Sequence, residues 1–86
     1  ANIAVMTCDI EKDRVYLFRH RGAGRGLYVY DARRNAWRDD VIPLPRSWRK
    51  STMANGFYHP GLGVHFIHVA NDSRDNGRIV VYRPAD

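Results

Sequence analysis

The sequence predicts an all-β chain made of two similar antiparallel units, and three observations support this prediction. Apolar and polar residues alternate with a period of two in several short segments, no window keeps a helical period beyond two turns, and the first half aligns with the second. A length of 86 residues limits the chain to one small domain or a fragment of something larger. No apolar run approaches the roughly 18 residues of a membrane-spanning helix, so we expect no membrane span.

Seven segments are predicted to be strands because they are rich in alternating β-branched and aromatic residues. The first unit has them at residues 3–8, 14–19, 26–30 and 36–38, and the second at residues 52–58, 63–69 and 77–82. Segments rich in Gly, Asn and Asp separate them, at residues 9–13, 21–26, 31–35, 59–63 and 71–77. Asn76-Gly77 is a strong hairpin signal, because both residues tolerate positive φ.

An internal repeat divides the chain at Pro45. Residues 7–18 align with residues 57–68 at an offset of 50, and residues 27–31 align with residues 79–83 at an offset of 52. Units of 40 to 50 residues with four strands have the period of a β-propeller blade. We therefore expect blade-like units at residues 1–45 and 46–86, joined by the linker 41–45. Such a chain either completes a propeller by homo-oligomerisation or is a fragment of a longer propeller.

The first unit resembles a kelch repeat in its second half. Six residues separate Tyr30 from Trp37, and Pro43-Leu44-Pro45 follows. The resemblance implies that Tyr30, Trp37 and Tyr82 pack between blades, which makes Trp37 a core residue and Trp48 the more exposed tryptophan. The Gly-Gly doublet of kelch repeats is absent from both units.

Charge is distributed unevenly over the predicted blades. Twelve of the fourteen basic residues are arginine, and the formal net charge is +5. One set of loops carries seven cations and two carboxylates, whereas the opposite loops carry three cations and four carboxylates. We expect an acidic partner to bind the basic loops, where Trp48 and His20 add stacking surface. The candidate binding residues are His20, Arg21, Arg25, Trp48, Arg49 and Arg74. Exposed arginines that protect strand edges from wrong pairing would give the same pattern.

Several motifs resemble known sites and are interpreted as structural. The segment 73–77 matches the first positions of the Asp box of sialidase-like propellers, but it reads as a turn. A strand follows the Gly-rich segment 22–26, so no helix N-terminus is available to bind phosphate. His65 and His68 point to opposite faces of their strand, which argues against a shared metal. We expect no metal, no cofactor and no catalytic site.

The sequence therefore predicts a non-catalytic binding or structural module. The first alternative is a fragment of an oxidase- or sialidase-like propeller enzyme, and the second is a nucleic-acid-binding module that uses arginine and tryptophan. Self-association as a homotrimer is preferred, with a dimer or a tetramer as alternatives. An acidic protein or glycan is the expected partner, ahead of nucleic acid. The single cysteine, Cys8, and the absence of a visible signal peptide favour the cytoplasm.

Overall fold

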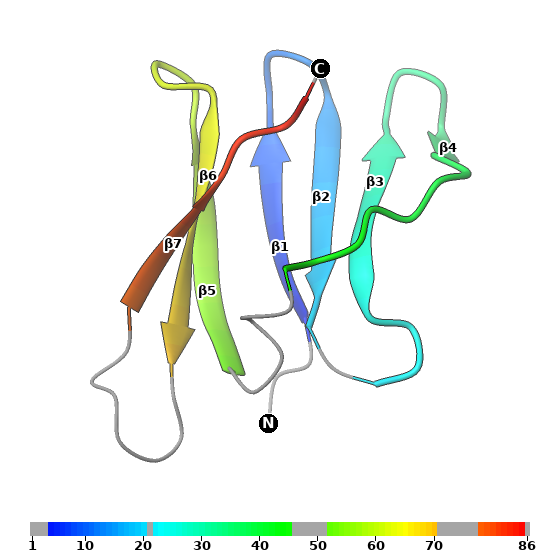
Figure 1. The fold of residues 1–86 in the computed structure, drawn as a ribbon. Coiled ribbons are helices and arrows are strands. Elements are labelled where there is room, and N and C mark those ends of the chain that lie inside the picture. Colours follow the sequence, from blue (N-terminus) through cyan, green and yellow to red (C-terminus); the bar gives the residue numbers. More distant parts are fainter. Residues whose placement is uncertain (1–3, 21, 46–51, 71–77, 86) are drawn as a thin grey trace.

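The computed structural model describes residues 4–20, 22–45, 52–70 and 78–85, which form two antiparallel β-sheets (Figure 1). Sheet 1 has the order β1 (Ala4–Asp9), β2 (Arg14–Arg19), β3 (Gly26–Asp31) and β4 (Ala36–Trp37). Sheet 2 has the order β5 (Thr52–His59), β6 (Val64–Ala70) and β7 (Arg78–Tyr82). These described residues contain no helix. The all-β prediction is confirmed, and each described strand matches a predicted one to within one residue at either end.

The first turn of each unit ends at a residue with a positive φ angle. In the β1–β2 turn the Asp9 side chain accepts hydrogen bonds from the amides of Glu11 and Lys12, and Asp13 ends the turn with a φ of 53°. Gly63 ends the β5–β6 turn with a φ of 67°. Asp13 and Gly63 are 50 residues apart, and a short polar side chain or glycine is what this left-handed conformation requires.

The strand registers also coincide at the two offsets of the sequence alignment. Tyr16 pairs with Thr7 and Val29 in sheet 1, and Phe66 pairs with Phe57 and Val81 in sheet 2. The same correspondence holds for the other four pairs of β1–β2 that align with β5–β6 on the turn side of the bulge between Met53 and Asn55. Each residue of sheet 2 between this bulge and Tyr82 therefore has a defined structural equivalent in sheet 1.

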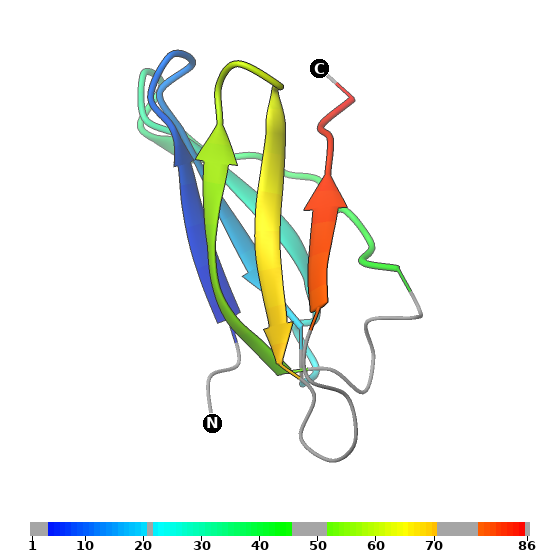
Figure 2. The same cartoon turned by 90° about the vertical axis from the view of Figure 1, so that its left-hand side faces the viewer.

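The two sheets lie face to face as two layers (Figure 2). They come closest at β1 and β5, which lie side by side and run in the same direction (Figure 1). We call the faces that meet the inner faces and the opposite ones the outer faces. The core lies between the inner faces and is formed by the side chains of Val5, Tyr16, Phe18, Leu27, Val29, Leu44 and Ile67, with Ile42, Val80 and Tyr82 packed against it.

The linker closes the core on the side of β3. Leu27 and Ile42 exchange backbone hydrogen bonds of 2.7 and 3.0 Å. The linker therefore pairs with the same edge of β3 as β4 does. From there the linker, green in Figure 1, turns across the sheet, and Leu44 is buried in the core. Two apolar residues of the predicted linker, Ile42 and Leu44, therefore belong to the core, whereas Val41 is exposed.

The inner faces of the two sheets are not structural equivalents of each other. Thr7, Tyr16 and Val29 on the inner face of sheet 1 correspond to Phe57, Phe66 and Val81, which lie on the outer face of sheet 2. The inner face of sheet 2, formed by Tyr58, His65 and Tyr82, corresponds to the outer face of sheet 1, formed by Cys8, Val15 and Tyr30. The sheets are thus stacked front to back and are not related by a two-fold axis.

Candidate functional site

Arg25 joins the β2–β3 loop to the end of the linker. Its Nε donates to the carbonyl oxygen of His20 at 3.1 Å, and its Nη atoms donate to the carbonyls of Leu44 at 3.4 Å and Pro45 at 2.8 Å. The planar guanidinium group suits this task because its donors have fixed directions. The loop and the linker end, which the sequence assigned to the same basic face, are therefore adjacent.

The structure describes two of the residues predicted to bind a partner, His20 and Arg25. The His20 side chain is fully buried, so its ring offers no stacking surface, and that expectation is wrong. Arg25 is part of the fold, because its guanidinium group satisfies backbone carbonyls. The other candidates, Arg21, Trp48, Arg49 and Arg74, lie outside the described residues.

The opposite end of sheet 1 carries the acidic turns, as predicted. Arg33 in the β3–β4 turn donates to Asp13 at 2.8 Å and to the carbonyl oxygen of Glu11 at 2.9 Å, so the two turns are neighbours. The hydrogen bond to Asp13 raises the pKa of Arg33. Both partners are well exposed, and such a pair adds little to stability.

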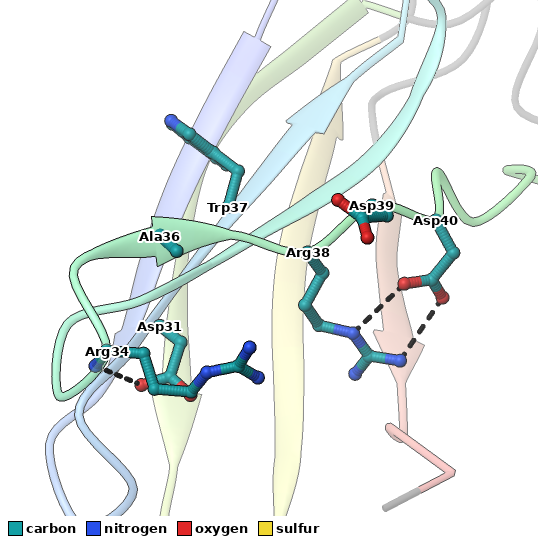
Figure 3. A pocket seen from close by; sticks show the side chains of 7 residues that line it. All are labelled: Asp31, Arg34, Ala36, Trp37, Arg38, Asp39 and Asp40. Carbon is teal, nitrogen blue, oxygen red and sulfur yellow. Dashed lines mark hydrogen bonds and ion pairs between the residues drawn. The ribbon is translucent and has the colours of Figure 1, made fainter.

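A pocket of about 410 Å³ lies beside the β3–β4 turn (Figure 3). Asp31 anchors one side, where its carboxylate accepts hydrogen bonds from the amides of Arg33 and Arg34 at 3.0 and 3.3 Å. On the other side Arg38 donates to both oxygens of Asp40, each at 3.2 Å. The remaining lining residues are Ala36, Trp37 and Asp39.

This pocket offers charged groups to a polar ligand. The hydrogen bonds from Arg38 lower the pKa of Asp40, which keeps this carboxylate ionised. Both oxygens of Asp40 accept hydrogen bonds from Arg38, whereas the bonds from the amides of Arg33 and Arg34 go to Oδ1 of Asp31. A sequence signal existed in the adjacent residues Asp39 and Asp40, but the pocket forms only because the turn places Asp31 and Arg34 opposite them.

Arg38 and Asp40 also line a second pocket, of about 390 Å³, between the two sheets. Sheet 1 contributes Tyr16 and Val29, and the chain after β7 contributes Pro84 and Ala85. The other lining residues are Ile42 and Tyr82. The Arg38–Asp40 ion pair therefore separates an open charged pocket from a more apolar one at the margin of the core.

His65 is fully buried between the sheets. Its Nδ1 lies 2.7 Å from Thr7 Oγ1, and its Nε2 has no hydrogen-bond partner among the described residues. Its ring centroid is 4.2 Å from that of Tyr16 and 4.7 Å from that of Tyr58. Burial lowers the pKa of His65 to about 4 although the carboxylate of Asp9 acts in the opposite direction. His65 is thus a neutral core residue.

His65 and His68 lie on opposite faces of β6, as predicted. His68 lines an apolar pocket on the outer face of sheet 2. Within the described part of the chain, no three His, Cys, Asp or Glu side chains come together as metal ligands would.

The residues predicted to pack between blades lie in two different places. Tyr82 is between the sheets, with its ring centroid 5.6 Å from that of Phe18 and 6.0 Å from that of His65. Tyr30 and Trp37 contact each other edge to face at 5.3 Å on the outer face of sheet 1. Trp37 is 52% exposed, so the expectation of a core tryptophan is wrong for the chain by itself.

Comparison with known proteins gives no relative of this chain. No family model, no curated protein and no solved structure matches it. In the described segments there is no helix with the length and apolar character needed to cross a membrane.

Proposed function

We propose that this chain is a non-catalytic binding or structural module in which the two sheets are consecutive kelch-like blades of a β-propeller. The observation that supports the proposal is the front-to-back stacking of sheets 1 and 2 at matching registers. In a propeller every blade presents one face to the preceding blade and the other face to the next. β1 and β5, which begin the two units, run in the same direction side by side, as the strands nearest a propeller axis do (Figure 1).

The partner of this module is an acidic protein or glycan, which binds the end that carries the β2–β3 loop. The sequence places an excess of arginine in the loops of this end. Arg25 brings the β2–β3 loop against the linker end, whereas the opposite end carries the acidic turns with Glu11, Asp13 and Asp31. This polarity would steer an acidic partner and accelerate its association.

A titration with a poly-glutamate peptide and with a sulfated glycan at two salt concentrations tests the binding. We expect Arg21→Glu and Arg49→Glu, each alone, to weaken binding at low salt, because the sequence assigns both arginines to the basic loops and each substitution reverses a charge. Arg34→Glu makes the same charge change at the opposite end, where Arg34 is exposed, and serves as the matched control. Equal weakening by all three variants would contradict a directed binding face, and no binding by the parent would refute the proposed function. Arg25 is left intact because it holds the linker.

Assembly completes the proposed propeller. Closed propellers have about four to eight blades, so two, three or four copies of a two-blade chain could form a ring. Three copies, which make six blades, remain the preferred number.

A further inference from the structure

Two apolar faces of the molecule are exposed, one on each sheet. Met6 and Trp37 on the outer face of sheet 1, and Phe57, Ile79 and Val81 on the outer face of sheet 2, are each more than half exposed. A pocket of about 310 Å³ on sheet 1 is lined by Leu17, Arg19, Tyr28 and Trp37, and one of about 300 Å³ on sheet 2 is lined by Asn55, Gly56, Phe57, Phe66, His68 and Ile79. Exposed apolar patches that hold pockets mark interaction surfaces.

The structure indicates what could cover these exposed outer faces, because each of them corresponds to an inner face of the other sheet, and both inner faces are covered. The outer face of sheet 2 corresponds by register to the inner face of sheet 1, and the outer face of sheet 1 corresponds to the inner face of sheet 2. Each sheet thus has two kinds of face, and the interface inside the chain joins one kind on sheet 1 to the other kind on sheet 2. One face of each kind is also left over, so the exposed pair can meet in the same front-to-back order. Met6 stands at the position equivalent to Gly56, so the two sheets would lie further apart there than in the covered interface.

The polar contact of the covered interface changes consistently on both exposed faces. Thr7 and His65 form a hydrogen bond across the core. Phe57 stands at the position equivalent to Thr7, and Val15 stands at the position equivalent to His65. If these two positions face each other in a second interface, an apolar pair replaces the polar pair, and neither position leaves a buried polar group without a partner.

We propose that the outer face of sheet 2 in one copy of this chain docks on the outer face of sheet 1 in a second copy. This inference deepens the proposed function, since it rests on the two sheets being propeller blades. Phe57 of one copy then lies near Val15 of the next, and Phe66 packs where Tyr16 packs in the covered interface. Cys8, which is exposed and equivalent to the inner-face residue Tyr58, becomes shielded on docking.

The experiment blocks one face at a time and measures the mass in solution by light scattering with analytical ultracentrifugation. Met6→Glu blocks sheet 1, and Phe57→Glu blocks sheet 2; both side chains are exposed, so the fold of a single copy tolerates the changes. We expect the parent to form a discrete oligomer and each variant to be a monomer of about 10 kDa. Mixed in equal amounts, the two variants should form a dimer, because one free face of each kind remains.

The matched controls are Ile10→Glu and Leu62→Glu, which place the same charge on exposed side chains in turns away from both faces. Both should assemble like the parent. If a face variant loses its fold by circular dichroism, Trp37→Glu replaces Met6→Glu and Ile79→Glu replaces Phe57→Glu. Cys8 supplies a second readout: a maleimide should react with the parent at least ten times more slowly than with the Phe57→Glu variant.

Three results would overturn the inference. The first is a parent chain that stays monomeric at all concentrations, and the second is a dimer formed by either face variant alone, which would show that like faces dock. The third is a mixture of the variants that stays monomeric. None of these results touches the binding of acidic ligands to the loops, so failure of the docking and failure of the binding function are distinguishable.

Discussion

His65 shows how a single side chain can be both polar and part of the core. Thr7 satisfies one ring nitrogen, and three tyrosine rings and Phe18 surround the imidazole. The carboxylate of Asp9 favours the protonated form of the ring but does not outweigh burial. A neutral ring is the consequence, since a charged one would lose its hydration without gaining an ion pair.

The first prediction is a fall in stability at mildly acidic pH. The pKa of His65 is about 4 in the folded chain and about 6.5 when unfolded, so the unfolded state binds a proton more readily. The contribution of neutral His65 to the free energy of unfolding is therefore complete above pH 6.5. It decreases as the pH falls towards 4, and the total loss is about 3 kcal/mol. Urea unfolding at intervals between pH 4 and 7.5 measures it.

The His65→Phe variant isolates this contribution because it keeps a ring of similar size and removes the titrating group. Its free energy of unfolding should depend less on pH than that of the parent, whereas His59→Gln, at the exposed last residue of β5, should behave like the parent. An unchanged pH dependence in His65→Phe would show that His65 does not titrate abnormally.

The second prediction concerns Arg25, whose three hydrogen bonds to carbonyl groups connect two segments. Arg25→Lys keeps the charge but cannot reach the carbonyls of residues 20, 44 and 45 together. We expect a loss of about 1–3 kcal/mol in the free energy of unfolding. Arg34→Lys, at an exposed turn position, is the control and should cost almost nothing. Equal stability of the two variants would contradict the structural role of Arg25.

At the scale of elements, local sequence explains the strands and turns well. Alternating residues form the two meanders, and Asp9 and Asp31 act as turn residues through hydrogen bonds to backbone amides that follow them. The linker is the exception, because its prolines predict a segment that only connects the two units. Its apolar residues Ile42 and Leu44 instead fill the opening between the sheets.

The third prediction tests this role of the linker. Leu44→Ala removes a buried side chain and should cost about 2–5 kcal/mol, because it leaves a cavity in the core. Leu62→Ala makes the same change at an exposed turn residue and should cost about 0.5 kcal/mol or less. Chemical denaturation of both variants beside the parent gives the comparison. Similar losses in the two variants would show that the linker does not belong to the core.

At the scale of the whole molecule, the close approach of the two sheets depends on Gly56. A Cβ atom there would lie 2.8 Å from the carbonyl oxygen of Phe66, 2.9 Å from Ile67 Cδ1 and 3.3 Å from Thr7 Cγ2. The first two atoms belong to sheet 2 and the third belongs to sheet 1. A larger residue therefore disturbs β5 and β6 and also pushes β5 away from β1.

The fourth prediction is that Gly56→Val loosens the contact between the sheets. We expect a loss of about 1–3 kcal/mol in stability, as for an overpacked core. Water that enters the gap should also raise the pKa of His65 from about 4 towards its ordinary value, which NMR titration of the imidazole measures. Gly61→Val, in the exposed β5–β6 turn, is the control and should leave this pKa unchanged. A stable Gly56→Val variant with the parent's His65 titration would contradict the argument.

The candidate site was predictable only in part from the sequence. The charge pattern separated the acidic turns from the basic loops, and the ion pair of Arg33 with Asp13 confirms that the acidic turns are neighbours. The same pattern could not show that His20 is buried or that Arg25 bonds to the linker. Burial and hydrogen bonding depend on segments that are distant along the chain, and composition carries no information about which of them meet.

The sequence by itself determined the all-β class, the strand positions and the alignment of the two units. Alternation and turn residues act locally, and the registers of the two sheets coincide at the offsets of 50 and 52 that align the two units. Only the tertiary structure decided which faces meet, since both faces of each sheet carry apolar residues and alternation does not distinguish them. It placed His65 and Tyr82 inside and left Tyr30 and Trp37 on an open face, because a side chain is buried only where another layer covers it.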